Sequence, residues 1–538
     1  MKRFRCAFGA LAAAMLLAAC GSDNTQTSVE NTTTTTHGTL VEDPPLRIAS
    51  LDATTFSTEL SSTTSGQQLL AITGAPTCGV DFYYLKFYTT GAAGEVTMSS
   101  GAMMVPTGAA GTCSGARPIV LYAHGTTTDK TYNIADITNT SNTEGDLVAA
   151  MFAAQGYIVV APNYAGYDVS TLSYHPYLDA AQQSGEMLDI LTAARTALPK
   201  TMTSATSDSG KLYVTGYSQG GYVAMATQKA LQAAGTPPTA MAGGSGPYAL
   251  EAFGDLIFTG HPDLGSTVFS PLLTTSYQHA YGNIYSATTD VYSSTYATGI
   301  DTLLPSATPI DTIFANGLLP ETALFDSTTP TAADFPSTVP AQTAAELAVL
   351  MEVPTPSPTN LATQIWYVGF GNPYLVNNSY RIGYVLDAAT NMDGALATPA
   401  TYTLAATPPT QTLRNAFYVN DMRNGGWVPE APTLLCGGEN DPTVYFTNTQ
   451  IMQAYWTAVV PAPTGALNVL DVDPSTGPSG PFAAIQTAFQ TDAAATIAAL
   501  ESSGLTQAEA EQEAIQNYHT SVAPFCLLAA RSFFESVP

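Results

Sequence analysis

A serine placed between a strand and a helix is the feature that most constrains how this chain folds. Residues 216–220 read Gly-Tyr-Ser-Gln-Gly; they follow the strand-like run 211–215 and precede the helix-like run 221–234. Glycines on both sides permit the strained turn that such a junction needs, because side chains there would clash where strand and helix pass close together. The turn would present the Ser218 hydroxyl clear of the backbone and aim the Gln219 amide at a reacting carbonyl. We therefore predict a nucleophilic Ser218; the alternative is an ordinary strand–helix turn that carries a serine.

Alternating strand and helix patterns around this turn predict an α/β fold with a mostly parallel, doubly wound sheet. Strand patterns occur at 118–123, 157–162, 239–244, 431–438 and 466–472, after a β-hairpin over 81–106. Helical patterns occur at 178–197, 481–502, 506–517 and about 524–536. From about 247 to 410 the alternation stops. We expect a large, mainly helical insertion there, which caps the carboxyl ends of the strands where such sheets bind ligands.

The first twenty residues predict an export signal rather than part of the fold. Lys2, Arg3 and Arg5 precede a short apolar run over 7–19, which is too short to span a bilayer. Residues 17–20 read Leu-Ala-Ala-Cys and resemble the lipobox of bacterial lipoproteins, so Cys20 is the predicted site of acylation. A plain secretory signal with an incidental Cys20 is the alternative.

The residues after the signal predict a lipid-anchored protein. Residues 21–45 are rich in Thr, Ser and Asn and would form a flexible tether to a single domain over 46–538. Gly21 after the cysteine resembles the sorting pattern of outer-membrane lipoproteins. We therefore expect export to the bacterial cell envelope, with the outer membrane as the location and membrane contact through N-terminal acyl chains only.

The charge balance is strongly acidic. The chain has 42 acidic and 15 basic residues, and removal of the signal leaves 12 basic ones. Such a surface repels nucleic acid and anionic lipid, which argues against a nucleic-acid partner.

Four cysteines remain after Cys6 and Cys20 are set aside, namely Cys78, Cys113, Cys436 and Cys526. An even number in an exported protein indicates disulfides, and four cysteines allow three pairings. We favour Cys78–Cys113, which would close the N-terminal β region, and Cys436–Cys526. Metal binding is the lesser interpretation, since no C-x-x-C pair or nearby histidine supports zinc; no metal site and no cofactor are predicted.

A nucleophilic serine needs a base, and the base needs a carboxylate that fixes its tautomer. His519 is the only histidine that follows every candidate acid in the order serine, acid, histidine. Asp441 directly follows the apolar strand 431–438 and is the predicted acid. Its rivals are Asp421, Asp471 and Asp473. A disulfide between Cys436 and Cys526 would clamp the acid loop to the histidine loop.

The strand 118–123 ends in His124-Gly125-Thr126, which predicts the second half of an oxyanion hole. We assign the donor amides to Gln219 and Thr126, with Gly125 as the alternative to Thr126, and expect His124 to be structural. With these parts, His519 would take the Ser218 proton during attack on an ester, and water would then release the acid.

Several stretches resemble the secretory lipase family of the α/β-hydrolase superfamily. They are residues 122–126 (Tyr-Ala-His-Gly-Thr), 163–167 (Asn-Tyr-Ala-Gly-Tyr), 175–178 (His-Pro-Tyr-Leu), the serine turn, 246–248 (Gly-Pro-Tyr) and the surroundings of Asp441 and His519. The resemblance spans about 75–538 and is weak in the insertion. It implies an α/β-hydrolase fold, carboxylester hydrolysis and a helical cap over an acyl-binding pocket, with Ser218, Asp441 and His519 as the triad. Asn163 departs from the Asp that related hydrolases often carry in this loop.

Three functions remain open at this stage. The first is an esterase or lipase acting on a lipid, a small ester or a polyester oligomer. A serine peptidase of the same fold is the second, and a surface lipoprotein without activity is the third.

Overall fold

The computed structural model describes residues 36–137, 139, 142–203, 205–356, 361–396, 402–458 and 464–538, excluding the side chains of 361–363. The predicted signal, Cys20 and residues 21–35 of the predicted tether lie outside these residues. The described part forms one compact unit.

A nine-stranded sheet forms the core of the described residues, and most of it is parallel, as predicted. Its order is β1-β2-β3-β5-β4-β6-β7-β10-β11. The strands β5, β4, β6, β7, β10 and β11 are parallel, whereas β1, β2 and β3 add an antiparallel edge. The bounds are β1 Leu46–Leu51, β2 Gly79–Thr90, β3 Val96–Thr107, β4 Gly115–Ala123, β5 Ile158–Pro162, β6 Thr206–Tyr217, β7 Ala240–Gly244, β10 Thr433–Gly437 and β11 Leu467–Asp471.

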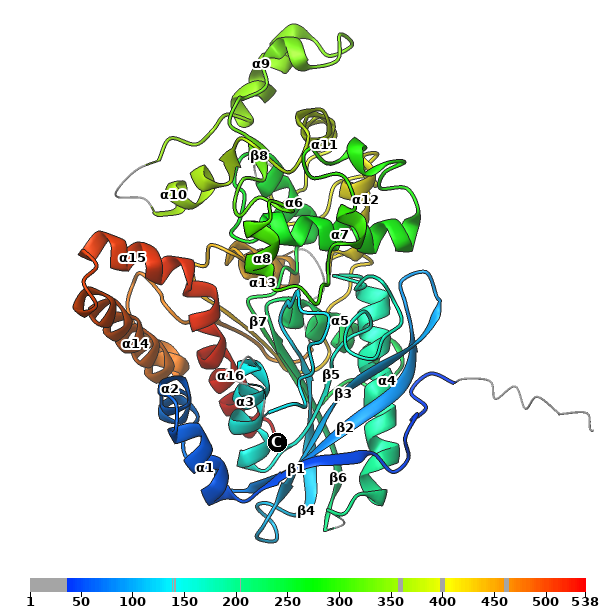
Figure 1. Ribbon diagram of the computed structural model, residues 1–538, viewed down its shortest axis with the longest axis vertical. Helices are drawn as coiled ribbons and strands as arrows, with labels where there is room; N and C mark the ends of the chain where they lie inside the picture. The colour runs from blue at the N-terminus through cyan, green and yellow to red at the C-terminus, as the bar shows by residue number, and fades with distance from the viewer. Residues whose placement is uncertain are drawn as a thin grey trace, which may run out of the picture. The chain divides into compact units, whose positions relative to one another are not determined.

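Helices cover both faces of the sheet (Figure 1). Successive side chains of a strand point to opposite faces, so Leu121 of β4 packs into one apolar core and Val120 into the other. Helices α4 (Ala180–Ala197) and α5 (Gln219–Ala233) cover the first face. The second is covered by α1 (Ala53–Ser61), α2 (Thr64–Thr73), α3 (Thr143–Met151) and α16 (Tyr518–Ser536).

The end of the predicted tether is part of the fold. Within residues 36–45, the amides of Gly38 and Val41 donate to carbonyl oxygens of Tyr88 and Lys86 in β2, at 2.9 and 2.8 Å. Ordered contacts with the domain therefore begin before residue 46.

A helical insertion between β7 and β10 lies beyond the carboxyl ends of the parallel strands (Figure 1). It contains α6 Leu250–Phe258, α7 Ser266–Tyr281, α8 Ile310–Ala315, α9 Ala341–Leu350, α10 Leu361–Val368, α11 Asn378–Thr390 and α12 Thr412–Asn420, with a small sheet of β8 Phe325–Asp326 and β9 Phe370–Gly371. We call this insertion the cap. It extends past the predicted end at about 410, because α12 continues to Asn420 and packs against α6.

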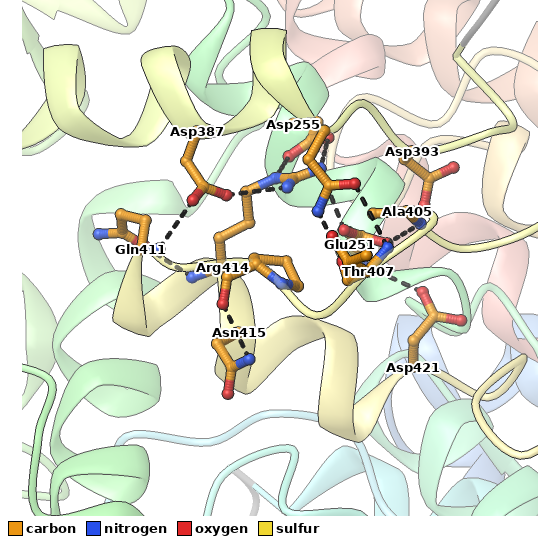
Figure 2. A network of polar contacts seen from close by, with 12 residues as sticks. Glu251, Asp255, Asp387, Asp393, Ala405, Thr407, Gln411, Arg414, Asn415 and Asp421 are labelled. Atoms are coloured by element: carbon orange, nitrogen blue, oxygen red, sulfur yellow. Dashed lines mark hydrogen bonds and ion pairs between the residues drawn. The ribbon is translucent and has the colours of Figure 1, made fainter.

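A buried ionic network joins the helices of the cap (Figure 2). Arg414 of α12 pairs with Glu251 and Asp255 of α6 and with Asp387 of α11 at 2.7–3.0 Å. Arg423 pairs with Asp393 and Asp421, both at 2.7 Å. Both arginine side chains are fully buried, so water has little access to these ion pairs. The rival acid Asp421 thus has a structural role in this network.

The chain after β10 contains α13 (Thr447–Ala458), β11, a hairpin of α14 (Ala483–Ser502) and α15 (Gln507–Gln516), and then α16. The last helix was predicted to begin at about Pro524, but it begins at Tyr518 and includes His519 in its first turn. Pro524 removes only one helical hydrogen bond, and burial of Val522, Phe525 and their neighbours holds the helix together around it. Among the described residues, none of the helices combines the length and apolar character needed to span a membrane.

Both favoured disulfides are present. Cys78–Cys113 joins the start of β2 to the turn before β4, with Cα atoms 5.4 Å apart. Cys436–Cys526 joins β10 to α16, with Cα atoms 5.6 Å apart. The second bridge therefore connects the element before Asp441 to the helix that carries His519.

Candidate active site

Ser218 occupies the turn between β6 and α5 in a strained conformation. Its φ is +60° and its ψ −124°, a region that residues with side chains rarely adopt. A Cβ on Gly216 would overlap the carbonyl of Gly220, and one on Gly220 would overlap that of Ala123. The Ser218 amide donates to Gly244 at the end of β7 at 2.9 Å, which fixes the turn to the sheet.

Asp441 and His519 meet from distant parts of the chain. His519 Nδ1 lies 2.7 Å from Asp441 Oδ2, and both side chains are buried. Asp441 Oδ1 accepts from the amides of Thr443 and Val444 at 2.9 and 3.0 Å. Because the Asp441 carboxylate can only accept a hydrogen bond, Nδ1 of neutral His519 carries the proton and Nε2 is the basic atom. Among the described residues, Nε2 has no hydrogen-bond partner.

The loop after β4 lines the cavity that Ser218 and His519 also line. The Gly125 amide donates to Glu144 Oε1 at 2.9 Å, and the Tyr122 hydroxyl donates to the same oxygen at 2.6 Å. The Gly125 amide is therefore occupied, which favours Thr126 as the oxyanion donor. Within the described part of the chain, the amides of Thr126 and Gln219 donate to no other protein group.

Two buried histidines support this region and remain neutral. Burial lowers the pKa of His124 to about 4 and that of His175 to about 3. His124 contacts the carbonyl oxygens of Gly125 and Asn163, at 2.7 and 3.1 Å. His175 lies 2.7 Å from the Gln219 side-chain amide, which donates to its Nε2. These contacts give His124 a structural position and link His175 to the residue after Ser218.

Sequence reasoning missed Glu144 and the Gln219–His175 contact. Glu144 lies in the first turn of α3, and an acidic residue there is also expected from helix electrostatics alone. A carboxylate after an oxyanion loop is a weak signal, because only the fold reveals that the two meet. The rivals Asp471 and Asp473 are bound elsewhere: Asp471 Oδ1 accepts from the amides of Glu439 and Asp473 at 3.1 and 3.0 Å.

Two cavities meet at Ser218. The larger, of about 1160 Å³, lies between the cap and the helices α1, α2, α3, α14 and α16, and we call it the cleft. The smaller is a narrow cavity of about 70 Å³ under the cap, which we call the cap cavity. Its walls are mainly apolar and include Leu250, Phe253, Phe269, Leu273, Leu413 and Phe417.

Residues 144–234, which include the serine turn, match the prolyl oligopeptidase family. No curated protein sequence matches the chain significantly. The rice cell wall degrading esterase LipA from Xanthomonas oryzae is a similar solved structure, with 23% identity over 81% of this chain and 91% of that one, and a TM-score of 0.57. Its ligand-bound form gives a TM-score of 0.63 at 21% identity, covering 94% of this chain and 100% of that one.

A putative hydrolase from Legionella pneumophila is also similar, with 18% identity over 93% of this chain and 98% of that one, and a TM-score of 0.57. At these identities the likeness shows the fold. Together with the parallel sheet, the serine turn after β6 and the helical cap, it shows that the chain has an α/β-hydrolase fold.

Proposed function

We propose that the protein is a serine carboxylester hydrolase, an esterase or lipase that acts through Ser218, His519 and Asp441. One observation carries the proposal: His519 holds Asp441 with Nδ1, its Nε2 has no hydrogen-bond partner among the described residues, and His519 and Ser218 line the same cleft. A base in this state can accept the hydroxyl proton during attack. The similarity to an enzyme described as an esterase adds support.

The proposed catalytic cycle assigns one role to each of these groups. His519 Nε2 takes the Ser218 proton as Oγ attacks the ester carbonyl, and the amides of Gln219 and Thr126 stabilise the oxyanion. The protonated His519 then gives the proton to the departing alcohol. Water repeats the sequence on the acyl-enzyme and releases the acid. The apolar cap cavity next to Ser218 would hold the acyl chain.

Hydrolysis of p-nitrophenyl esters from C2 to C16 tests the proposal. Ser218→Ala is expected to lose at least about 10³-fold in kcat, whereas Ser270→Ala, which removes a hydroxyl from the wall of the cap cavity, should change kcat only a few-fold. Equal turnover by wild type and Ser218→Ala would exclude the serine. The chain-length optimum reports how much of the cap cavity the acyl chain fills.

A serine peptidase is the second candidate, favoured by the match to the prolyl oligopeptidase family. That match covers the serine turn and its flanking helices but neither Asp441 nor His519. A glycyl-prolyl-p-nitroanilide assay beside the ester series separates the two, since a peptidase would cleave the anilide with the higher kcat/KM.

We also propose that Cys20 carries the lipid anchor and that the protein is exported to the cell envelope. The lipobox-like residues 17–20 and the signal-like segment before them support this. Radiolabelled palmitate should label the full chain and not its Cys20→Ser variant, with Cys6→Ser as the matched control. Labelling of Cys20→Ser would overturn the anchor, and density-gradient separation of membranes tests the outer-membrane location.

A further inference from the structure

The cleft is a ligand site on grounds independent of its charge. Ser218, Thr126 and His519 line it, and His519 is only 8% exposed while its Nε2 lacks a protein partner among the described residues. A substrate held here would have its alcohol portion in the cleft if its acyl chain occupies the cap cavity. The groups along the cleft therefore meet the alcohol portion of an ester.

All the fixed charges that line the cleft are negative. They belong to Glu59, Glu144, Asp146, Glu321 and Asp492, and no lysine or arginine of the described chain lines it. None of these carboxylates forms an ion pair with a described basic residue. Burial and the charge of Glu59 raise the pKa of Asp146 to about 6, and burial raises the pKa of Asp492. Among the described residues, no lysine or arginine side chain therefore lies beside these carboxylates in the cleft.

The negative lining continues into an adjoining cavity of about 830 Å³ between α10 and the α14–α15 hairpin. This cavity shares Asp492, Thr496 and Ser521 with the cleft. It adds the carboxylates of Glu439, Asp441, Asp473, Glu511 and Glu513, and its described walls also lack lysine and arginine. Carboxylates therefore line both adjoining cavities.

The basic residues after the signal are placed elsewhere. Four make exposed or half-exposed ion pairs, and two belong to the buried network of the cap: Arg47, Lys86, Arg195, Lys200, Arg414 and Arg423. Five donate to main-chain carbonyl oxygens: Arg117, Lys130, Lys229, Arg381 and Arg531. The last basic residue, Lys211, is exposed and lies about 20 Å from Ser218 along β6.

We infer that the cleft selects esters by the charge of their alcohol portion, favouring cationic alcohols over uncharged ones and rejecting anionic ones. The inference rests on the proposed esterase function. Carboxylates along a cleft with low-dielectric walls focus a negative potential, which concentrates cations and repels anions. The same potential repels the carboxylate product of hydrolysis.

Three butyrate esters of similar size test the inference: the choline ester, its uncharged isostere the 3,3-dimethylbutyl ester, and the anionic 3-sulfopropyl ester. At pH 8 and low salt, kcat/KM for the choline ester should exceed that for the isostere by about tenfold, and the sulfonate should be slower by a similar factor. Both ratios should approach one at 0.5 M NaCl, where the Debye length is about 4 Å. Ratios near one at low salt would overturn the inference.

Two triple variants with equal net charge separate the cleft from the rest of the surface. Asp146→Asn, Glu321→Gln and Asp492→Asn together neutralise three cleft carboxylates outside the triad and the oxyanion loop. Glu346→Gln, Glu352→Gln and Glu430→Gln together neutralise three that line none of the three cavities. The first should lose most of the charge preference and the second should keep it. An equal loss in both would assign the preference to net charge alone and overturn the inference.

Binding provides a readout that does not need turnover. The amide isosteres N-(2-trimethylammonioethyl)butyramide and N-(3,3-dimethylbutyl)butyramide can be titrated into the intact protein by calorimetry. Tighter binding of the cationic amide that weakens in the cleft variant supports the inference, and equal binding overturns it. If no ester is hydrolysed, the proposed function fails, while this comparison still decides the charge preference.

Discussion

Glu144 determines which amide of the oxyanion loop is free. A single oxygen of its carboxylate accepts from both Tyr122 and Gly125, and the position of a Cβ on Gly125 would lie 3.8 Å from Ser218 Cβ. The loop is thus held against the nucleophile with the Gly125 amide turned toward Glu144. Thr126, whose hydroxyl lies 2.8 Å from that of Tyr177, has an amide that donates to no group among the described residues, as its proposed role in the oxyanion hole requires.

Replacement of Glu144 tests this positioning role. Glu144→Ala removes the acceptor and should lower kcat on p-nitrophenyl butyrate by about 10–100-fold with little change in KM, since oxyanion donors act mainly in the transition state. Glu144→Gln keeps a carbonyl oxygen that can accept both hydrogen bonds and should restore most of kcat. An Ala variant with wild-type kcat, or a Gln variant as impaired as Ala, would show that Glu144 does not position the loop.

At the scale of single residues, local pattern could predict the turn that holds Ser218 but not the contacts that support it. The position of Ser218 follows from a strand, two glycines and a helix that are adjacent in sequence, and His519 and Asp441 follow from chain order. The contacts of Glu144 with Gly125 and of His175 with Gln219 span 19 and 44 residues. Nothing in the local sequence fixes such contacts, because they depend on how β4, α3 and α5 pack.

The disulfide Cys436–Cys526 ties together the two elements that carry Asp441 and His519. Replacement of both cysteines by serine should lower stability by about 5 kcal/mol for a loop of 90 residues and also reduce kcat. The disulfide Cys78–Cys113 closes a loop of 35 residues away from Asp441 and His519. Replacement of these two cysteines by serine should therefore lower stability by about 4 kcal/mol and leave kcat unchanged. Urea unfolding and kcat below the transition measure both. Equal loss of kcat in the two variants would contradict the clamp.

Arg414 of α12 is joined through three buried or nearly buried carboxylates to α6 and α11. Arg414→Met should destabilise the protein by about 3–5 kcal/mol, because it leaves buried charges uncompensated. Leu250 and Phe253 of α6 and Leu413 of α12 line the cap cavity, so the dependence of kcat/KM on acyl-chain length should change too. The exposed pair Arg195–Asp208 is the control: Arg195→Met should cost about 1 kcal/mol or less. Similar losses of stability in Arg414→Met and Arg195→Met would show that the buried network does not stabilise the cap.

At the scale of elements, the sheet and its helices could be predicted more fully than the cap. Parallel strands buried on both faces give continuous apolar runs such as 118–123, which are legible in sequence. The cap helices do not alternate with strands, and buried ion pairs between residues far apart in the sequence join them in addition to apolar contacts. The start of α16 was misplaced for a related reason: Pro524 signals a helix boundary locally, whereas burial around it continues the helix.

For the whole molecule, buried titratable groups of opposite kind give stability an unusual pH dependence. Burial raises the pKa of Glu186 and of Asp263 to about 7. These carboxyls bind protons in the folded state at pH values where the unfolded chain does not, so each contributes stability that is lost as pH rises through its folded pKa. His124 and His175 act in the opposite direction below about pH 6.5, where only the unfolded chain protonates them.

The carboxyls should prevail between pH 8 and 5.5, because His124 and His175 begin to oppose them only in the lower part of this range. Mutual repulsion among 42 acidic residues adds to the same trend. We therefore expect the free energy of unfolding to be a few kcal/mol larger at pH 5.5 than at pH 8, and the melting temperature to be higher at pH 5.5. Scanning calorimetry of the mature protein in matched buffers measures it. Glu186→Gln should flatten the profile, and 0.3 M NaCl should raise the melting temperature more at pH 8 than at pH 5.5. A melting temperature that falls from pH 8 to pH 5.5 would mean that the histidines dominate and that Glu186 and Asp263 are ionised in the fold.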